Sequence, residues 1–266
     1  MKIKKYFVIG NPIDHSLSPK LQNRWIKENN IDAVYEKAKL NDNQIENFIQ
    51  KIKNQEIAGC NVTVPFKNIV IPFLDNLTLE AEQTQSVNTI VYDNGNLVGH
   101  NTDIAGFYKA IKSLNFNIKG KTVFILGAGG VVSSVIFALK KLRVLNITVS
   151  NRTRLKAENL KILFSDLNVV EWGSLPDFDV IINATSLGLN NEKINLDFTK
   201  IGKNKLFYDV IYNPSETEFL KKGRELGNKT ENGKLMFLYQ AHEAFKLWYG
   251  KEPAINEETF KLLDND

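Results

Sequence analysis

The 266-residue sequence predicts an α/β protein of two domains, each an open sheet with helices on its faces. Two observations predict this fold class. Short apolar segments alternate with segments of helical spacing over residues 6–64, which is typical of a mostly parallel or mixed sheet. A second such series opens at residues 122–126, a strand that is apolar on both faces and therefore buried on both. The length suits two domains of moderate size.

The first domain is read as alternating strands and helices. The expected strands are 6–9, 34–40, 57–64 and 87–92, and the expected helices are 19–29 and 42–52, the latter capped by Asn41 or Asp42. Asn94-Gly95 lies between two apolar runs, which is the strongest short hairpin signal. The hairpin closes this domain, so we expect residues 1–102, joined by C-terminal helices of about 235–266, to form it.

The second domain is expected over residues 103–234. It begins with a helix at 103–114 and continues with the strand 122–126, a helix at 131–142 and a strand at 146–150. Further strands are expected at 179–183 and 206–210, and closing helices at 234–249 and 257–263.

Composition excludes several classes of protein. The formal net charge of +4 and pI near 8.9 arise from interspersed charges, without the basic stripe that nucleic-acid binding requires. Cys60 is the single cysteine, so an internal disulfide and a cysteine-based zinc site are excluded. The N-terminal apolar run is broken at residues 10–12, and no segment has the roughly 20 apolar residues of a membrane span. We expect a cytoplasmic protein with a small-molecule ligand, no membrane or nucleic-acid partner and no metal.

A glycine-rich loop follows the strand 122–126 and opens a helix. Gly127 permits the tight turn and Gly129 lets backbone approach a pyrophosphate, which is then held by the free N–H groups of the helix N-terminus. With a second strand at the right distance, this βαβ unit predicts a Rossmann-like dinucleotide-binding domain. Val132 stands where a third Gly or Ala usually allows close helix packing.

The end of the second strand selects the cofactor. An NAD site normally has a carboxylate there to bind the ribose 2′-hydroxyl, whereas this chain has Asn151-Arg152-Thr153 followed by Lys156. Arg152 can stack on adenine and bind a 2′-phosphate, with Thr153 and Lys156 as further donors. The pattern favours NADP over a merely solvated basic turn.

Four polar stretches in the first domain remain unexplained by packing: residues 10–19, 61–67, 87–89 and 99–103. Together with the motifs at 151–153, 183–186, 208–214 and 240–241, they resemble the shikimate dehydrogenase family over nearly the whole chain. The resemblance implies NADP-dependent, reversible interconversion of 3-dehydroshikimate and shikimate, the pathway to chorismate and the aromatic amino acids, and a cleft between the domains.

The resemblance also implies roles for single residues. Lys67 and Asp103 match the catalytic pair, and proton transfer at a secondary alcohol needs such groups. We treat them as a coupled pair that shares the proton. The matching substrate-binding residues are Ser16, Ser18, Asn61, Thr63, Asn88, Tyr212 and Gln240. The matching cofactor-binding residues are Gly127, Ala128, Gly129, Gly130, Asn151, Arg152, Thr153, Lys156, Thr185, Ser186 and Gly233.

Several of these positions also have structural interpretations. Ser18 before Pro19 has the pattern of a helix N-cap, Lys67 could be one more solvated lysine, and Tyr212 could be a packed aromatic. The chain departs from the family's usual pattern at Gln85-Ser86, Leu189 and Leu235.

Three alternatives stay open at this point. The nearest is a quinate/shikimate dehydrogenase with broader substrate or cofactor use. A methylenetetrahydrofolate dehydrogenase-like enzyme shares the architecture, but its substrate has no shikimate-like carboxylate for Ser16 and Ser18. A non-catalytic NADP-binding regulator would be expected to lose the pair of Lys67 and Asp103, and both are present. The oligomeric state, monomer or homodimer, is not decided by the sequence.

Overall fold

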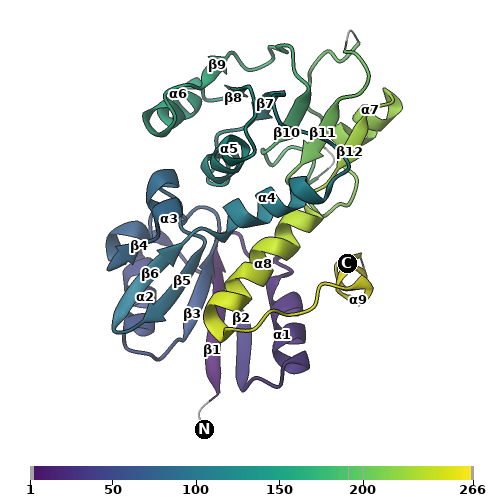
Figure 1. Ribbon diagram of the computed structural model, residues 1–266. Helices are drawn as coiled ribbons and strands as arrows, with labels where there is room; N and C mark the ends of the chain where they lie inside the picture. Colours follow the sequence, from purple (N-terminus) through teal and green to yellow (C-terminus); the bar gives the residue numbers. More distant parts are fainter. Residues whose placement is uncertain (1–2, 191, 200, 265–266) are drawn as a thin grey trace. The chain divides into compact units, whose positions relative to one another are not determined.

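The structure is a computed structural model that describes residues 3–190, 192–199 and 201–264 (Figure 1). The chain divides into two compact units. Unit 1 comprises Met1–Ala105 and Leu238–Asp266, and unit 2 comprises Gly106–Phe237. Each unit contains one six-stranded sheet with helices packed against it, which confirms the predicted two-sheet α/β fold class. No helix in the described part of the chain is both long enough and apolar enough to cross a membrane.

The sheet of unit 1 has mixed strand directions. The strands, in sheet order, are β2 (Ala33–Lys39), β1 (Lys4–Gly10), β3 (Gly59–Val62), β5 (Thr89–Asp93), β6 (Asn96–His100) and β4 (Asn76–Leu77). The strands β2, β1 and β3 pair in parallel, whereas β5 pairs antiparallel with both β3 and β6. The predicted hairpin is confirmed, because Asn94 and Gly95 join β5 to β6 with positive φ angles of 47° and 86°.

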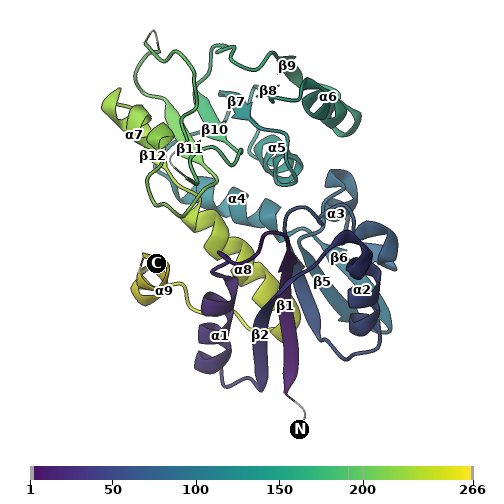
Figure 2. The ribbon, with the colours of Figure 1, turned by 180° about the vertical axis from the view of Figure 1, so that it is seen from behind.

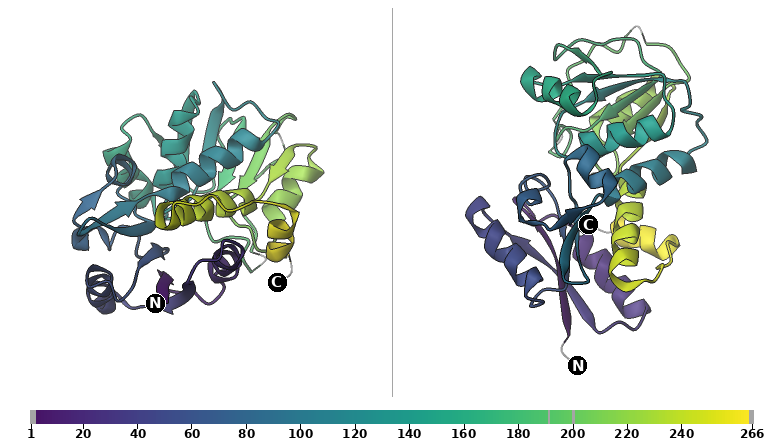
Figure 3. Two further views of the ribbon diagram at one scale, coloured as in Figure 1. Left: turned by 60° about the horizontal axis from the view of Figure 1, so that its bottom comes forward. Right: turned by 60° about the vertical axis from the view of Figure 1, so that its left-hand side comes forward.

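Helices cover both faces of this sheet (Figure 3, right). On one face, α2 (Ile45–Lys53) packs its apolar residues against Cys60 and Val62 of β3. On the other lie α1 (Ser18–Glu28) and α8 (Lys234–Tyr249), whose Trp25 and Phe245 rings are 5.8 Å apart. Because side chains alternate along a strand, Gly59 and Asn61 of β3 belong to the α1 and α8 face.

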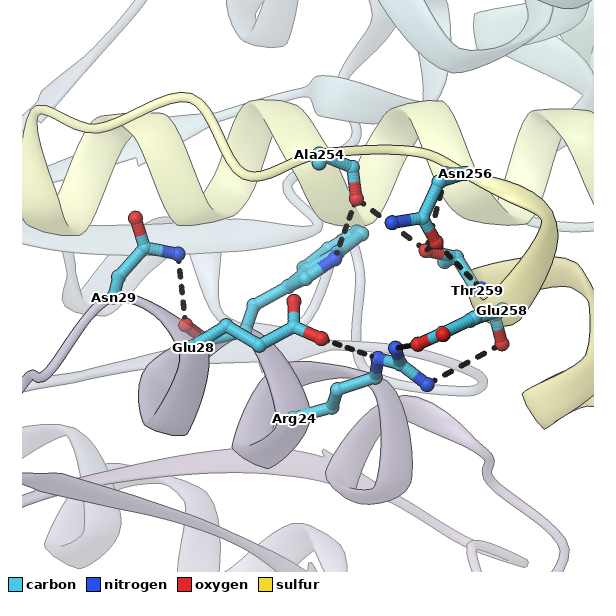
Figure 4. A network of polar contacts seen from close by, with 8 residues as sticks. Arg24, Glu28, Asn29, Ala254, Asn256, Glu258 and Thr259 are labelled. Carbon is cyan, nitrogen blue, oxygen red and sulfur yellow. Dashed lines mark hydrogen bonds and ion pairs between the residues drawn. The ribbon is translucent and has the colours of Figure 1, made fainter.

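The C-terminal segment is fastened to α1. The indole Nε1 of Trp25 donates to the carbonyl of Ala254 at 3.1 Å, and the Arg24 guanidinium pairs with Glu258 of α9 (Glu257–Asp264; Figure 4). The backbone N–H of Thr259 donates to Asn256 Oδ1 at 3.0 Å, which begins α9. These contacts explain why residues at the end of the chain return to the domain that the start of the chain builds.

The sheet of unit 2 is parallel throughout. Its strands, in sheet order, are β12 (Lys229–Glu231), β11 (Leu206–Asp209), β10 (Val180–Asn183), β7 (Thr122–Leu126), β8 (Asn146–Ser150) and β9 (Asn168–Val170). Phe207 packs with Phe219 of α7 (Glu218–Glu225), while its neighbour Tyr208 meets Phe107 of α4 (Thr102–Ser113) at 5.1 Å. Since adjacent strand residues point to opposite faces, α7 and α4 cover opposite faces of this sheet (Figure 2).

Several expectations need correction. The strand expected over 57–64 ends at Val62, and the helix expected over 42–52 begins as a 3-10 turn at Asp42–Gln44. Between Phe66 and Val87 the sequence predicts a short helical stretch, and the structure has η2 (Ile71–Phe73) and α3 (Leu79–Thr84) there. Sequence reasoning gave no expectation for β4, α6 (Arg154–Leu163), β9, α7 and β12. The short strands β4, β9 and β12 have two or three residues each, too few to show a period-2 pattern.

Candidate active site

Lys67 lies in the turn that follows β3 and is buried, with 8% of its surface exposed. The N–H of Phe66 donates to the carbonyl of Thr63 at 2.9 Å, and the fully buried Phe66 ring anchors the turn in the core of unit 1. The backbone carbonyl of Lys67 accepts the N–H of Val87 at 2.8 Å. The sequence allowed a solvated surface lysine here, and the structure excludes that interpretation.

The partner of Lys67 is Asp103, in the first turn of α4. The ammonium Nζ of Lys67 is ion-paired with Asp103 Oδ2, and both side chains are about nine-tenths buried. Asn88 places this carboxylate. Its Oδ1 accepts the N–H of Thr102 at 2.7 Å and so caps α4, while its Nδ2 donates to Asp103 Oδ1 at 3.0 Å. Each Asp103 oxygen therefore has its own partner.

Ser18 is buried at the first position of α1 and is not the N-cap. The N-cap is Leu17, so the alternative interpretation of Ser18 as a cap is wrong. The backbone N–H of Ser18 donates to Ser16 Oγ at 3.3 Å. The two serines are thus adjacent in space, as a shared binding role requires.

Asn61 is surrounded by protein partners. Its Nδ2 donates to the carbonyl of Asn88 at 3.1 Å and to Thr89 Oγ1 at 2.9 Å, and its Oδ1 accepts the Tyr35 hydroxyl at 2.6 Å. Both N–H groups of the amide are engaged. Sequence reasoning missed Tyr35, because a tyrosine in a strand carries no motif of its own, and it included Thr89 in the motif 87–89 without giving it a role.

Two further predicted substrate-binding residues of unit 1, Thr63 and Gln240, are partly buried. Tyr212 belongs to unit 2, where its ring stacks on Phe237 at 4.5 Å. The ring of Tyr212 is therefore a packed aromatic, which was one of its two interpretations from the sequence.

The glycine loop of unit 2 has the geometry that a dinucleotide site needs. Gly127 follows β7 with φ of +112°, and a Cβ there would lie 2.7 Å from the carbonyl oxygen of Ala184. Gly129 is exposed, and a Cβ there would meet nothing within 4 Å. α5 (Val132–Lys141) begins next, and its N-cap residue, Val131, makes no side-chain capping hydrogen bond. Gly127 is thus required by the fold, whereas a side chain at position 129 would enter open space beside the start of α5.

The residues after β8 are open to solvent. Asn151 is partly buried, and Arg152, Thr153 and Lys156 are exposed. Among the residues that the structure describes, Arg152 has no carboxylate partner, whereas Arg154 is paired with two glutamates, Glu158 and Glu171. An unpaired guanidinium in this place fits a phosphate-bearing ligand.

A buried carboxylate organises the ends of β10 and β11. Asp209 accepts hydrogen bonds from Asn183 Nδ2, from the N–H of Ile211 and from Thr217 Oγ1, the last at 2.7 Å. Burial raises the pKa of Asp209 to about 6, and these hydrogen bonds oppose the rise. Asn183 in turn accepts the Thr185 hydroxyl at 2.7 Å, so the Thr185 side chain is used within the turn.

Two other predicted cofactor residues have different surroundings. Ser186 is exposed at the carboxyl end of β10. Gly233 is buried, and a Cβ there would lie 2.1 Å from the carbonyl oxygen of Val210. Close backbone packing alone is therefore sufficient to require a glycine at position 233.

Comparisons with known proteins agree with this geometry. Residues 8–90 match the family model described as the shikimate dehydrogenase substrate binding domain, and residues 109–210 match the model described as shikimate / quinate 5-dehydrogenase. A curated shikimate dehydrogenase (NADP(+)) of Pelagibacter ubique is 53% identical over 98% of this chain and 99% of its own length. The chain belongs to the shikimate dehydrogenase family.

Solved structures of this family share the fold. The crystal structure of shikimate dehydrogenase from Aquifex aeolicus matches with a TM-score of 0.89 and 38% identity, covering 99% of this chain and 98% of that one. The Thermus thermophilus enzyme, in complex with NADP(H) and shikimate, matches with a TM-score of 0.88 and 28% identity over 98% and 97% of the chains. The predicted combination of an N-terminal substrate domain and a Rossmann-like domain is confirmed by these neighbours.

Proposed function

We propose that this chain catalyses the NADP-dependent, reversible reduction of 3-dehydroshikimate to shikimate, with Lys67 and Asp103 handling the proton. The observation that carries the proposal is the buried ion pair of these two residues, held by Asn88. A buried lysine paired with one carboxylate is a poor device for stability, because desolvation opposes the attraction. The same arrangement suits proton transfer at a bound hydroxyl.

The chemistry follows from what each group can do. NADP, when bound, accepts or supplies the hydride at the carbon that carries the reacting hydroxyl. The alcohol must lose its proton as the hydride leaves, and the ketone must gain one in the reverse direction. Lys67 Nζ and Asp103 Oδ2 share one hydrogen bond, so a substrate hydroxyl beside them can pass its proton to the pair. Their burial keeps water from competing with the substrate for these atoms.

The remaining residues are assigned to binding. Ser16 and Ser18 bind the substrate carboxylate through their hydroxyls, and their direct contact with one another supports a joint role. Thr63, Asn88 and Gln240 bind the ring hydroxyls. Tyr212, a residue of unit 2, is also assigned to substrate binding.

The cofactor residues belong to unit 2, which we propose as the NADP domain, with unit 1 as the substrate domain. The residues from Gly127 to Gly130 hold the pyrophosphate, Asn151, Arg152, Thr153 and Lys156 hold the adenosine 2′-phosphate, and Thr185, Ser186 and Gly233 border the nicotinamide. The open space at Gly129 supports this assignment, as does the guanidinium of Arg152, which has no carboxylate partner among the described residues. Both features accept anions, and NADP has anionic groups at both places.

Quinate remains the competing substrate, because the model that matches residues 109–210 covers shikimate and quinate enzymes. The test is absorbance-monitored reduction of NADP and of NAD by the purified protein, with shikimate or quinate as the alcohol. We expect NADP with shikimate to have the highest kcat/KM. Equal or higher kcat/KM with quinate would replace the proposed substrate, and equal use of NAD would remove the role of Arg152. A cytoplasmic location and a monomeric or dimeric state stay predictions from the sequence.

A further inference from the structure

A continuous chain of buried polar side chains crosses the sheet of unit 1. We call Tyr35, Asn61, Thr89 and Asn88 the polar chain. Its hydrogen bonds run from the Tyr35 phenol to Asn61 at 2.6 Å and from Asn61 to Thr89 at 2.9 Å. Thr89 Oγ1 then donates to Asn88 Oδ1 at 3.1 Å, and Asn88 donates to Asp103. One end of the polar chain is Tyr35 in β2, and the other end holds the proposed catalytic pair.

The strand register explains how the polar chain is assembled. Tyr35 lies in β2 and Asn61 in β3, with β1 between them, so the phenol reaches across one strand to make its bond. Asn61 stands directly opposite Thr89 in the antiparallel pair of β3 and β5. Every member is less than one-tenth exposed, which means that water cannot replace a lost partner without entering the core.

We propose that Tyr35 and Asn61 are positioning residues, which fix Asn88 and, through it, Asp103 at the substrate site. This inference rests on the proposed function and revises the predicted substrate contact of Asn61. Both N–H groups of the Asn61 amide bond to its sheet neighbours, Asn88 and Thr89. The Asn88 amide is engaged as well, by Thr102 and Asp103, but it lies directly at the ion pair, so its proposed substrate contact is kept. The Tyr35 hydroxyl donates to the Asn61 side-chain oxygen. Burial raises the pKa of the Tyr35 phenol well above its ordinary value, so the phenol stays protonated and remains a donor.

The test removes single oxygen atoms from this arrangement. Tyr35→Phe deletes the phenol, and Thr89→Val replaces a strand residue by one of equal shape that strands favour. The matched control is Tyr249→Phe, because the Tyr249 hydroxyl is buried and has no hydrogen-bond partner among the described residues. Rates are measured with shikimate and NADP, and thermal midpoints are recorded for every variant.

For Tyr35→Phe we expect kcat to fall about tenfold and the KM for shikimate to rise about threefold, while the KM for NADP stays unchanged. In Tyr249→Phe, kcat and the KM values for shikimate and NADP should all stay within about twofold of wild type. Combining Tyr35→Phe with Thr89→Val should cost less than the product of the two single effects, because both act through Asn61. Wild-type kinetics in Tyr35→Phe, or multiplicative effects in the double variant, would overturn the positioning role.

Failure of the proposed function has a different signature. If the wild type does not oxidise shikimate with any cofactor, the proposed function is wrong. The positioning role of Tyr35 is then tested by comparing crystal structures of the wild type and Tyr35→Phe. Displacement of the Asn61 and Asn88 side chains in the variant supports the positioning role without any turnover. Unmoved side chains overturn it.

Discussion

Asn88 Nδ2 donates to Asp103 Oδ1 at 3.0 Å, which leaves Oδ2 of the same carboxylate to Lys67. This division of one carboxylate between an amide and an ammonium is set by the start of α4, because the same Asn88 also caps that helix. The geometry of the proposed catalytic pair is therefore established by backbone structure before any ligand binds.

The ion pair of Lys67 and Asp103 should behave as a buried pair in unfolding experiments. Lys67→Met leaves the carboxylate without its counter-charge and is expected to lower the free energy of unfolding by about 3–5 kcal/mol. The double variant Lys67→Met with Asp103→Asn should recover most of that loss. Urea unfolding of both provides the comparison.

The matched control for this experiment is the exposed ion pair of Lys53 and Asp75 in the same unit. Lys53→Met should cost below about 1 kcal/mol, since solvent screens exposed pairs. Equal losses in Lys53→Met and Lys67→Met would show that burial of the Lys67 pair has no energetic consequence.

The first two glycines of the cofactor loop, Gly127 and Gly129, should respond differently to one methyl group. Gly129→Ala is expected to leave stability within about 0.5 kcal/mol of wild type and to weaken NADP binding at least about tenfold, because its Cβ enters open space that the proposed pyrophosphate occupies. Gly127→Ala meets the Ala184 carbonyl and a positive φ, so it should destabilise the protein by about 1–3 kcal/mol. Calorimetric titration with NADP and thermal unfolding separate the two effects. Unaltered NADP affinity in Gly129→Ala would argue against the proposed loop contact.

Arg152 should determine the choice between NADP and NAD. Arg152→Ala is expected to lower kcat/KM for NADP about tenfold or more and to leave kcat/KM for NAD nearly unchanged, since NAD has no 2′-phosphate. Arg154→Ala is the control, because its guanidinium is occupied by Glu158 and Glu171. If Arg154→Ala changed cofactor preference as strongly as Arg152→Ala, the assignment of the phosphate to Arg152 would be wrong.

Asp209 should make stability depend on pH in an unusual direction. Its pKa rises from 3.8 to about 6 in the folded protein, so between these values the folded state binds more protons than the unfolded state. Protonation of Asp209 therefore adds to the free energy of unfolding below pH 3.8. This stabilisation, about 3 kcal/mol at most, is lost as the pH rises through 6.

Asp209→Asn removes this titration. The difference in unfolding free energy, wild type minus variant, should decrease between pH 4 and pH 7, as measured by urea unfolding at each pH. Taking the difference cancels the opposite trend of paired carboxylates such as Asp75 and Asp166, whose pKa values are lowered by their hydrogen bonds. A difference that stays constant with pH would show that Asp209 is ionised throughout this range.

The sequence was sufficient for the fold class because its signals are local. The strand of residues 122–126, the Gly127 turn and the Asn94-Gly95 hairpin each depend on neighbouring residues only, and all three are present in the structure. The ion pair of Lys67 with Asp103 was anticipated through a family resemblance and not through spacing.

The polar chain could not be anticipated in the same way. Tyr35 meets Asn61 across an intervening strand, so the contact depends on the register of β2, β1 and β3 together. No motif in a single segment encodes that register. Ser18 shows a further limit, because its position before Pro19 suggested a cap, whereas α1 begins at Ser18 itself and has Leu17 as its N-cap.

The most direct test of the proton-handling role is a single-turnover measurement of NADPH formation from shikimate by Lys67→Met, with Lys53→Met beside it. Both substrates are saturating, and NADP affinity is determined separately. We expect the rate of NADPH formation in Lys67→Met to fall by about 10²- to 10⁴-fold with NADP affinity unchanged, and Lys53→Met to match wild type. A wild-type rate in Lys67→Met would contradict the account, because proton transfer would then not require the buried lysine.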